Sequence, residues 1–255
     1  NYKSGNVITI GRAPSGMIDG TYYSYDGIYF YPDTLDGFKM MIDDYRGGTS
    51  YRAVNANNPY YNYYQYLPTR TISNYTSEDL KVDFSSYTSK MTGYPAKDNE
   101  SQLYGEHVSF IEYQNEYGVN AMMSLGLAKN ESAMGTSAIS YNKNNLFGIG
   151  AYDSNTAAAK AFSTVRESIR YFDKNVISEG YLDPLDVVAG GRYYGGHFGN
   201  KSSGFNVKYA SDPYWGEKEA SYYYNFDKAY GNQDYNKYTI GIKGSNGNYN
   251  IKKEP

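Results

Sequence analysis

Glu131 is the residue whose setting in the sequence best suits acid–base chemistry. It follows a mostly apolar run, residues 119–128, which predicts that it lies where a helix emerges from a core. Burial raises the pKa of a carboxyl group, and the negative end of a helix dipole acts in the same direction. A carboxyl group that keeps its proton near neutral pH can act as a general acid. The alternative is a glutamate that points into water at a helix end.

Three motifs decide between these alternatives. The first is Glu131 with Ser132 and the Gly-Thr-Ser of residues 135–137. The second is the Asn-Asn-Leu-Phe-Gly-Ile-Gly of residues 144–150, and the third is the Lys-Tyr-Ala-Ser-Asp-Pro-Tyr-Trp of residues 208–215. In order and rough spacing they resemble the motifs of the glucosaminidase domain of bacterial autolysins, glycoside hydrolase family 73, in its clostridial-type form.

The resemblance covers about residues 102–231 and implies a lysozyme-like α+β architecture with a long groove. It implies a secreted enzyme of the bacterial cell wall, an autolysin that acts on peptidoglycan glycan strands during wall turnover and cell separation. The expected activity is that of an endo-β-N-acetylglucosaminidase, which cuts the GlcNAc-β-1,4-MurNAc bond, with Glu131 as general acid. One departure is that many relatives carry Gly-Trp or Gly-Asn where this chain has Ala133 and Met134.

There are two candidates for the second catalytic group. Asp153, the nearest carboxylate after the second motif, could be the general base of an inverting reaction, in which the carboxyl groups are ~6.5–9.5 Å apart. It could instead cap the following helix. Alternatively, the substrate's own 2-acetamido group attacks the anomeric carbon. Tyr209 matches a tyrosine that the family places in its active site and would orient that group, unless it only anchors the last helix. We favour the substrate-assisted route.

Tyrosine is unusually abundant, with 34 residues against 10 Phe and one Trp. A tyrosine ring offers a flat apolar face and a hydroxyl at low rotamer cost, and such faces stack on sugars. Most of these rings must be structural, in cores and strands. We expect a minority to line a glycan groove whose floor is formed by the second motif. The expected substrate-binding residues are Ser132, Asn144, Asn145, Phe147, Tyr152 and Tyr214.

Composition excludes several other chemistries. The chain has no cysteine, which rules out disulfides and a cysteine nucleophile. Its two histidines, His107 and His197, are too few for a zinc peptidase, and no His-Glu-x-x-His motif occurs. A net charge of −3 without a basic cluster argues against nucleic acid, and no apolar run could span a bilayer. We therefore expect no metal or cofactor, and we also expect a monomer.

The sequence divides into three parts. Residues 1–95 are expected to form a β-containing, Tyr-rich N-terminal extension packed on the catalytic lobe, with a separate wall-binding module as the alternative. Residues 96–235 form the mainly helical catalytic domain, and residues 236–255 a C-terminal strand and tail.

Local signals predict the elements of these parts. Strand-like runs occupy residues 7–10, 22–25 and 28–31, the last two joined by a two-residue Asp-Gly turn, and a short helix covers residues 37–45. In the catalytic domain four helices are expected. They run from the caps at residues 98–101 to Tyr117, from Asn120 to Glu131, from Thr156 to Gly180, and onward from Asp212.

Two other functions fit the same pattern. A muramidase or a lytic transglycosylase would share the fold and a single essential glutamate, and would differ in the sugar left at the reducing end. A wall-binding module without catalysis would use the tyrosines alone, but the motif around Glu131 argues against it.

Overall fold

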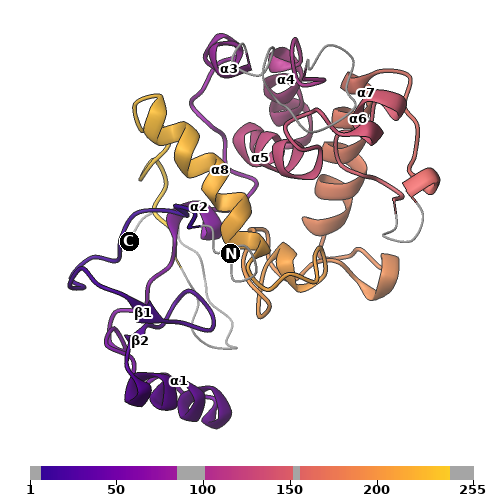
Figure 1. The fold of residues 1–255 in the computed structure, drawn as a ribbon. Coiled ribbons are helices and arrows are strands. Elements are labelled where there is room, and N and C mark those ends of the chain that lie inside the picture. Colours follow the sequence, from indigo (N-terminus) through magenta and orange to yellow (C-terminus); the bar gives the residue numbers. More distant parts are fainter. Residues whose placement is uncertain (1–6, 85–100, 152–155, 242–255) are drawn as a thin grey trace.

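The computed structural model describes residues 7–84, 101–151 and 156–241. A helical lobe holds the three motifs, and the small sheet and the long helix of the N-terminal extension lie at the other end of the molecule (Figure 1). The expected α+β class, a mainly helical lobe preceded by a β-containing extension, is confirmed.

The helices are α1 (Leu35–Gly47), α2 (Tyr63–Tyr66), α3 (Ser77–Phe84), α4 (His107–Tyr117), α5 (Ala121–Glu131), α6 (Ala138–Lys143), α7 (Val165–Tyr171) and α8 (Trp215–Ala229), with short 3₁₀ turns at Thr156–Ala158, Val188–Gly190 and Phe205–Val207.

The centre of the lobe is α5. Its first nine residues, 121–129, are all buried, so it has no polar face until its last turn. A helix that is apolar on every side must be surrounded by protein, and α4 and α8 pack against it. This packing carries the chain from the core to Glu131 in a single element, as the sequence predicts.

The start of α5 is fixed by two capping residues. Gly118 ends α4 in the left-handed conformation, with φ 64°. Asn120 is completely buried, and its side-chain oxygen accepts hydrogen bonds from the backbone N–H groups of Met122 (2.9 Å) and Met123 (3.2 Å). Both caps agree with the prediction.

The third predicted helix starts later than expected. Residues 156–158 form only a 3₁₀ turn, and α7 begins after Thr164, whose hydroxyl accepts from the backbone N–H of Glu167 at 3.1 Å. The Glu167 carboxylate in turn accepts from the backbone N–H of Ser163 at 2.8 Å. This reciprocal capping pair is the stronger start signal. A π-helix, Phe172–Tyr181, continues α7 to the predicted end near Gly180.

The hairpin of the extension also differs from the prediction. The strands are β1 (Tyr22–Tyr23) and β2 (Tyr31–Pro32), antiparallel, with Tyr23 opposite Tyr31. The Asp26 side chain accepts hydrogen bonds from the backbone N–H groups of Ile28 (2.9 Å) and Tyr29 (3.0 Å). This Asx-type turn folds residues 24–30 into a loop, so the expected two-residue turn is wrong.

Two further expected strands are absent from the described residues. Residues 7–10 are not in a strand. Residues 238–241 are not either, while Ile242 lies outside the described part. The backbone N–H of Tyr238 donates to the Tyr63 hydroxyl at 3.2 Å, and the Tyr238 hydroxyl donates to the carbonyl of Ile72 at 3.1 Å. This segment is therefore tied to the lobe by side chains.

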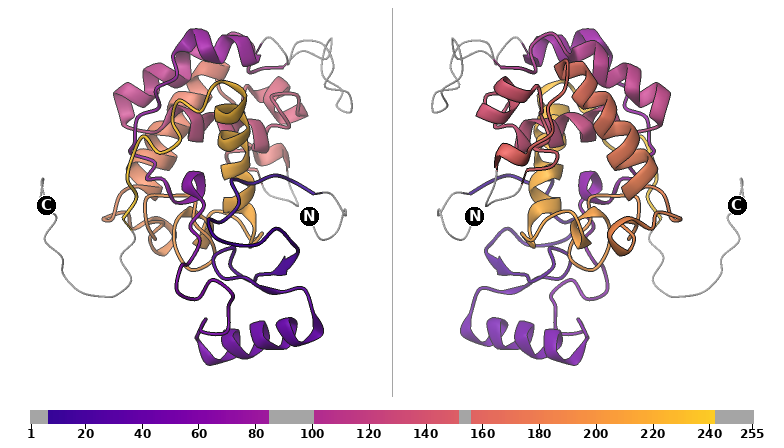
Figure 2. Two further views of the ribbon diagram at one scale, coloured as in Figure 1. Left: turned by 90° about the vertical axis from the view of Figure 1, so that its left-hand side faces the viewer. Right: turned by 90° about the vertical axis from the view of Figure 1, so that its right-hand side faces the viewer.

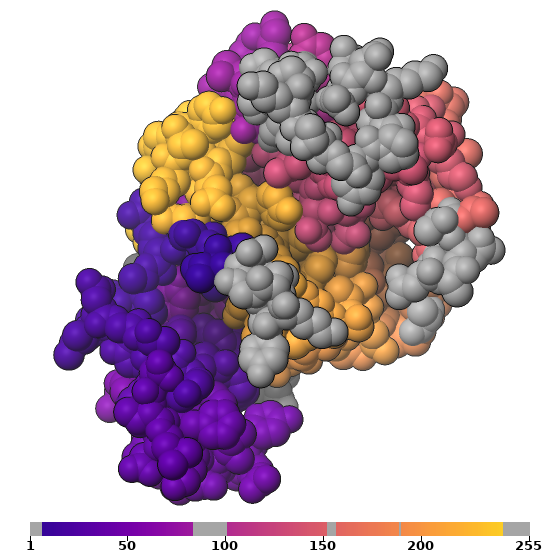
Figure 3. All heavy atoms as spheres, viewed as in Figure 1, coloured from indigo at the N-terminus to yellow at the C-terminus, as the bar shows by residue number. Residues whose placement is uncertain are grey.

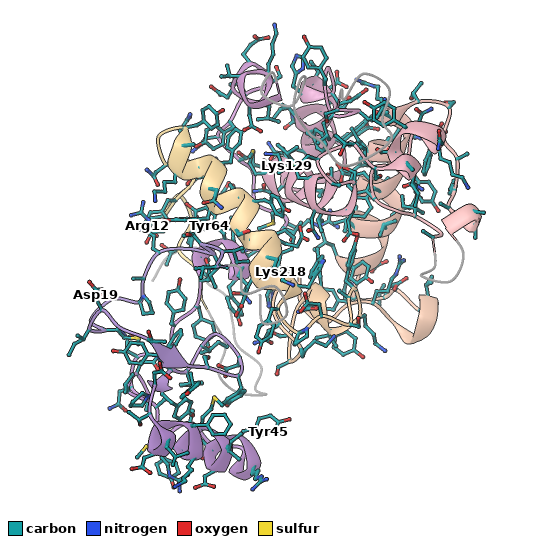
Figure 4. All side chains as sticks on the ribbon, viewed as in Figure 1. Arg12, Asp19, Tyr45, Tyr64, Lys129 and Lys218 are labelled. Carbon is teal, nitrogen blue, oxygen red and sulfur yellow. The ribbon has the colours of Figure 1, made fainter. Side chains whose placement is uncertain are left out.

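The Tyr-rich segment before the lobe is part of the lobe's core. Tyr64 in α2 is 1% exposed, and its hydroxyl donates to the Asp227 carboxylate of α8 at 2.7 Å. Its ring contacts Tyr223 and Tyr224 of the same helix. Figure 4 shows Tyr64 beside α8, while Tyr45 marks the far end of the extension on α1. The two views in Figure 2 confirm that α1 lies away from the helical lobe.

Removing the Tyr64 hydroxyl tests the contact between α2 and α8. Tyr64→Phe leaves a buried carboxylate oxygen with one hydrogen bond fewer, so we expect a loss of about 1–3 kcal/mol in the free energy of unfolding. Urea unfolding followed by circular dichroism measures it. Tyr45→Phe, at a side chain that is exposed, is the control, and equal losses in the two variants would contradict the account.

Candidate active site

Glu131 is the last residue of α5 and is half-buried. Burial raises the pKa of its carboxyl group. The indole N–H of Trp215, the first residue of α8, opposes this shift, although it makes no hydrogen bond of good geometry among the described residues. The carboxyl group therefore has the setting that the sequence predicts for a general acid.

The turn after Glu131 is built around Ser132. This side chain is completely buried, donates to the carbonyl of Ala128 at 2.5 Å, and accepts from the backbone N–H of Gly135 at 2.6 Å. The hydroxyl therefore both donates a hydrogen bond to the backbone and accepts one from it. The structure thus places this expected substrate-binding residue inside the turn that supports the acid.

The same turn holds three successive residues in the left-handed conformation. Ala133, Met134 and Gly135 have φ values of 51°, 61° and 76°. Left-handed backbone costs roughly 1–2 kcal/mol for a residue with a side chain. Ala133 and Met134 both carry a side chain, so this turn places backbone strain beside Glu131. Strained backbone of this kind is found at functional sites.

A second carboxyl group lies near Glu131. Glu219 of α8 is completely buried, and the Asn130 side-chain amide donates to its Oε1 at 2.6 Å. Its Oε2 is buried and has no partner among the described residues. Burial and the negative charge of Glu131 raise the pKa of Glu219 well above its usual range. Figure 4 labels Lys129 of α5 and Lys218 of α8, the two helices that pack against each other here.

None of the three sequence motifs includes Glu219. The signal was available, because Trp215, Ala220 and Tyr223 share the buried face of α8. A charged residue within such a face indicates either a partner or a raised pKa.

Tyr209 joins the same cluster. Its ring stacks on Trp215 with 4.5 Å between centroids and contacts Tyr181 at 5.3 Å. Burial and the charges of Glu131 and Glu219 raise the pKa of its hydroxyl well above the usual range. The phenol therefore stays protonated. Three motif residues from two distant segments, Glu131, Tyr209 and Trp215, are thus brought together.

The second motif builds a loop. Asn145 is completely buried, donates to the carbonyls of Ile149 (3.0 Å) and Lys160 (2.9 Å), and accepts from the backbone N–H of Phe147 at 3.2 Å. The Phe147 ring stacks on Phe172 with 3.8 Å between centroids.

Asn144 caps α6 in the left-handed conformation and donates to the carbonyl of Phe162 at 3.0 Å. The side chains of Asn144, Asn145 and Phe147 are therefore used in packing. The other two expected residues of this region, Tyr152 and Asp153, lie outside the described residues.

Tyr214 lies just before α8 and is 45% exposed. It lines a cavity of about 1400 Å³ between the lobe and the extension, together with aromatic rings from both parts. The space-filling view in Figure 3 shows the extension and the lobe meeting along one face of the molecule. Other rings on this cavity include Tyr25, Tyr45, Tyr61, Tyr66, Tyr193 and Tyr194.

The described residues contain no group of three or more His, Cys, Asp or Glu side chains that could hold a metal ion. Within the same ranges, no helix is long and apolar enough to cross a membrane.

The strained turn gives a stability prediction with opposite signs at two positions. Ala133→Gly relieves left-handed strain, and after the entropy cost of glycine we expect a gain of about 0.5–1 kcal/mol. Gly135→Ala places a Cβ 2.4 Å from Ser101 Oγ and 2.9 Å from the backbone nitrogen of Leu103, so we expect a loss of roughly 2 kcal/mol or more. Urea unfolding of both variants decides, and a destabilised Ala133→Gly variant would refute the strain argument.

Comparison with known proteins identifies the family of the helical lobe. The sequence model of the glucosaminidase family, described as mannosyl-glycoprotein endo-beta-N-acetylglucosaminidase, matches residues 107–228. Putative endo-beta-N-acetylglucosaminidases from two strains of Streptococcus pneumoniae are 35% identical over 214 residues, which is 84% of this chain. The chain spans only 26% and 24% of the length of these relatives.

Solved structures of S. aureus autolysin E are also similar. A catalytic mutant in complex with the disaccharide NAG-NAM has 18% identity and a TM-score of 0.48, covering 66% of this chain and 73% of that one. The complex with the muropeptide NAM-L-Ala-D-iGlu has 19% identity and the same TM-score. From the family match, supported by the sequence relatives, residues 107–228 form a domain of the glucosaminidase family of glycoside hydrolases.

Proposed function

We propose that this chain is an endo-β-N-acetylglucosaminidase that hydrolyses the GlcNAc-β-1,4-MurNAc bond of bacterial peptidoglycan, with Glu131 as general acid. The observation that carries the proposal is the carboxyl group at the end of the buried helix α5. Its pKa is raised by burial, and it lies in the family motif beside Tyr209 and Trp215. A protonated carboxyl group of this kind can donate to the leaving glycosidic oxygen.

We favour a substrate-assisted course for the reaction. The carbonyl oxygen of the 2-acetamido group attacks the anomeric carbon, the bond to the leaving oxygen breaks, and that oxygen takes the proton of Glu131. Water then opens the cyclic intermediate and returns a proton to the Glu131 carboxylate. The Tyr209 hydroxyl, which stays protonated, orients the acetamido group by a hydrogen bond. The part of Asp153, the alternative base, remains a prediction.

The cavity between lobe and extension supports a groove for an extended glycan strand. Tyr214, which directly precedes Trp215 in the chain, offers an exposed ring on this cavity and would stack on a sugar. We assign residues 1–95 to an extension that works with the catalytic domain, since α2 packs in the lobe core. Residues 96–235 are assigned to that domain and residues 236–255 to a C-terminal tail. The chain would act as a monomer outside the cell.

Replacing the acid separates catalysis from binding. Glu131→Gln keeps the shape of the side chain but removes the proton that the leaving oxygen needs, so we expect at least about 10³-fold slower lysis of purified cell walls. Co-sedimentation with the same walls should be unchanged. Glu116→Gln, at an exposed position of α4, is the control and should lyse walls normally. Lysis at the control rate by Glu131→Gln would remove Glu131 from the acid role.

The pH dependence of hydrolysis gives a second test. Glu131 must be protonated to act, so the rate is high below its pKa in the folded enzyme and falls as pH rises through it. The Trp215 indole N–H stabilises the carboxylate form. Trp215→Phe should therefore raise the pKa of Glu131 and move the alkaline limb of kcat/KM to higher pH, whatever it does to the maximal rate. A limb that moves to lower pH would contradict this assignment.

A further inference from the structure

The cavity between lobe and extension holds a carboxyl group that the proposed function does not use. Glu217 belongs to the first turn of α8 and lines this cavity. Within the described ranges it has no hydrogen bond and no ion pair. Tyr214, the exposed ring assigned above to a sugar, lines the same cavity and lies just before α8. An unpaired carboxyl group and a sugar-stacking ring therefore lie at the start of one helix.

The extension approaches Glu217 closely. Gly27 has a φ of 73°, and a Cβ built on it would lie 2.1 Å from Oε1 of Glu217. Only a glycine leaves room for the carboxyl group here. Asp26, the neighbour of Gly27 in the chain, lines the same cavity. The cavity thus has one carboxyl group from the lobe and one from the extension.

The other titratable groups of this region do not balance these two charges. Lys201 lines the cavity, but its ammonium group donates hydrogen bonds to three backbone carbonyls. Burial lowers the pKa of His197 to about 4, so this imidazole is neutral near neutral pH. Lys218, the next residue after Glu217, is paired with Asp212. Each cation is therefore engaged elsewhere.

A ligand with a positive charge would complement this cavity. Burial and the negative charges of Asp26 and Asp212 raise the pKa of Glu217 to about 7, which is the effect expected of a carboxylate that lacks a cation. The tyrosine rings on the cavity wall attract a cation as well, through their π faces. A carboxylate or a phosphate would be repelled by the two acids.

Peptidoglycan carries a positive charge of this kind in its stem peptides. The diamino acid of a stem has an alkyl amine, which resembles that of lysine with an ordinary pKa of about 10.4 and stays charged near neutral pH. The cavity of about 1400 Å³ is larger than the roughly 300–1,000 Å³ of a pocket for one drug-sized ligand. It has room for a stem peptide beside a sugar on Tyr214.

We propose that Glu217 and the tyrosine rings of this cavity form a subsite for the alkylammonium group of a stem peptide. Cross-linking turns this amine into an amide, so the subsite selects strands whose stems are not cross-linked. That the ligand is peptidoglycan rests on the proposed function. The preference for an ammonium group rests on the cavity alone.

Binding of two matched ligands to the Glu131→Gln variant tests the subsite without cleavage. One ligand is a soluble, uncross-linked and fully N-acetylated glycan strand with lysine in its stem peptides. The other is the same strand after acetylation of the lysine amines. At about pH 8 Glu217 carries its charge and lysine keeps its ammonium group. We expect isothermal titration calorimetry to show about tenfold weaker binding of the acetylated strand.

A second substitution assigns this preference to one carboxylate. Adding Glu217→Gln to Glu131→Gln removes the charge and keeps the shape of the side chain, so both strands should bind with the same, weaker affinity. Adding Glu116→Gln instead is the matched control, because it removes one negative charge at an exposed position of α4. This control should keep the tenfold preference.

Equal affinity of the Glu131→Gln protein for the two strands, or binding of neither, would overturn the proposal, and this arm holds even if the second substitution prevents folding. A preference that survives Glu217→Gln would also overturn it, since the ammonium group would then bind elsewhere. So would loss of the preference in the Glu116→Gln control. Hydrolysis by the wild type is measured separately. If the wild type cleaves no peptidoglycan while the preference depends on Glu217, the proposed function fails and the ammonium subsite stands.

Discussion

The burial of α5 is the constraint on which the rest of the structure depends. A helix with nine successive buried residues cannot be placed at a surface, so α4 and α8 must cover it. Only its last two residues, Asn130 and Glu131, are partly exposed to solvent. The acid is thus held at the end of a buried helix, and its raised pKa follows from the same burial that stabilises the fold.

Tyrosine hydroxyls are a second structural theme, and they explain much of the unusual composition. The Asp227 carboxylate accepts from Tyr64 at 2.7 Å and Tyr75 at 2.6 Å, and that of Asp234 accepts from Tyr223 at 2.7 Å. Buried carboxylates need such donors, and a tyrosine brings one at the end of an apolar ring. These bonds join segments from before and after the catalytic motifs, so the abundance of tyrosine serves the core as well as the cavity.

The sequence predicted the features whose signals are local. The cap at Asn120, the end of α4 at Gly118, the start of α8 near Trp215 and the position of Glu131 each depend on a few adjacent residues. The predicted hairpin turn and the predicted start of α7 were wrong. In both places a side chain, that of Asp26 or Thr164, accepts backbone hydrogen bonds that override the dipeptide or periodicity signal.

The parts of the site that could not be predicted depend on tertiary contacts. Asn144, Asn145 and Phe147 are predicted to form the floor of a groove, and only the folded loop shows that their side chains also make backbone hydrogen bonds and ring contacts. The burial of Glu219 is signalled by its place on the apolar face of α8, but its proximity to the end of α5 could not be predicted, because it depends on a contact between segments about ninety residues apart in the chain.

The sugar left at the reducing end of the released fragments tests the central claim most directly. Purified peptidoglycan is digested, the new ends are reduced with borohydride, and the fragments are identified by mass spectrometry. The account predicts reduced GlcNAc ends. Reduced MurNAc ends would show a muramidase, anhydro-MurNAc ends a lytic transglycosylase, and no release a binding module, and each of these results would contradict it.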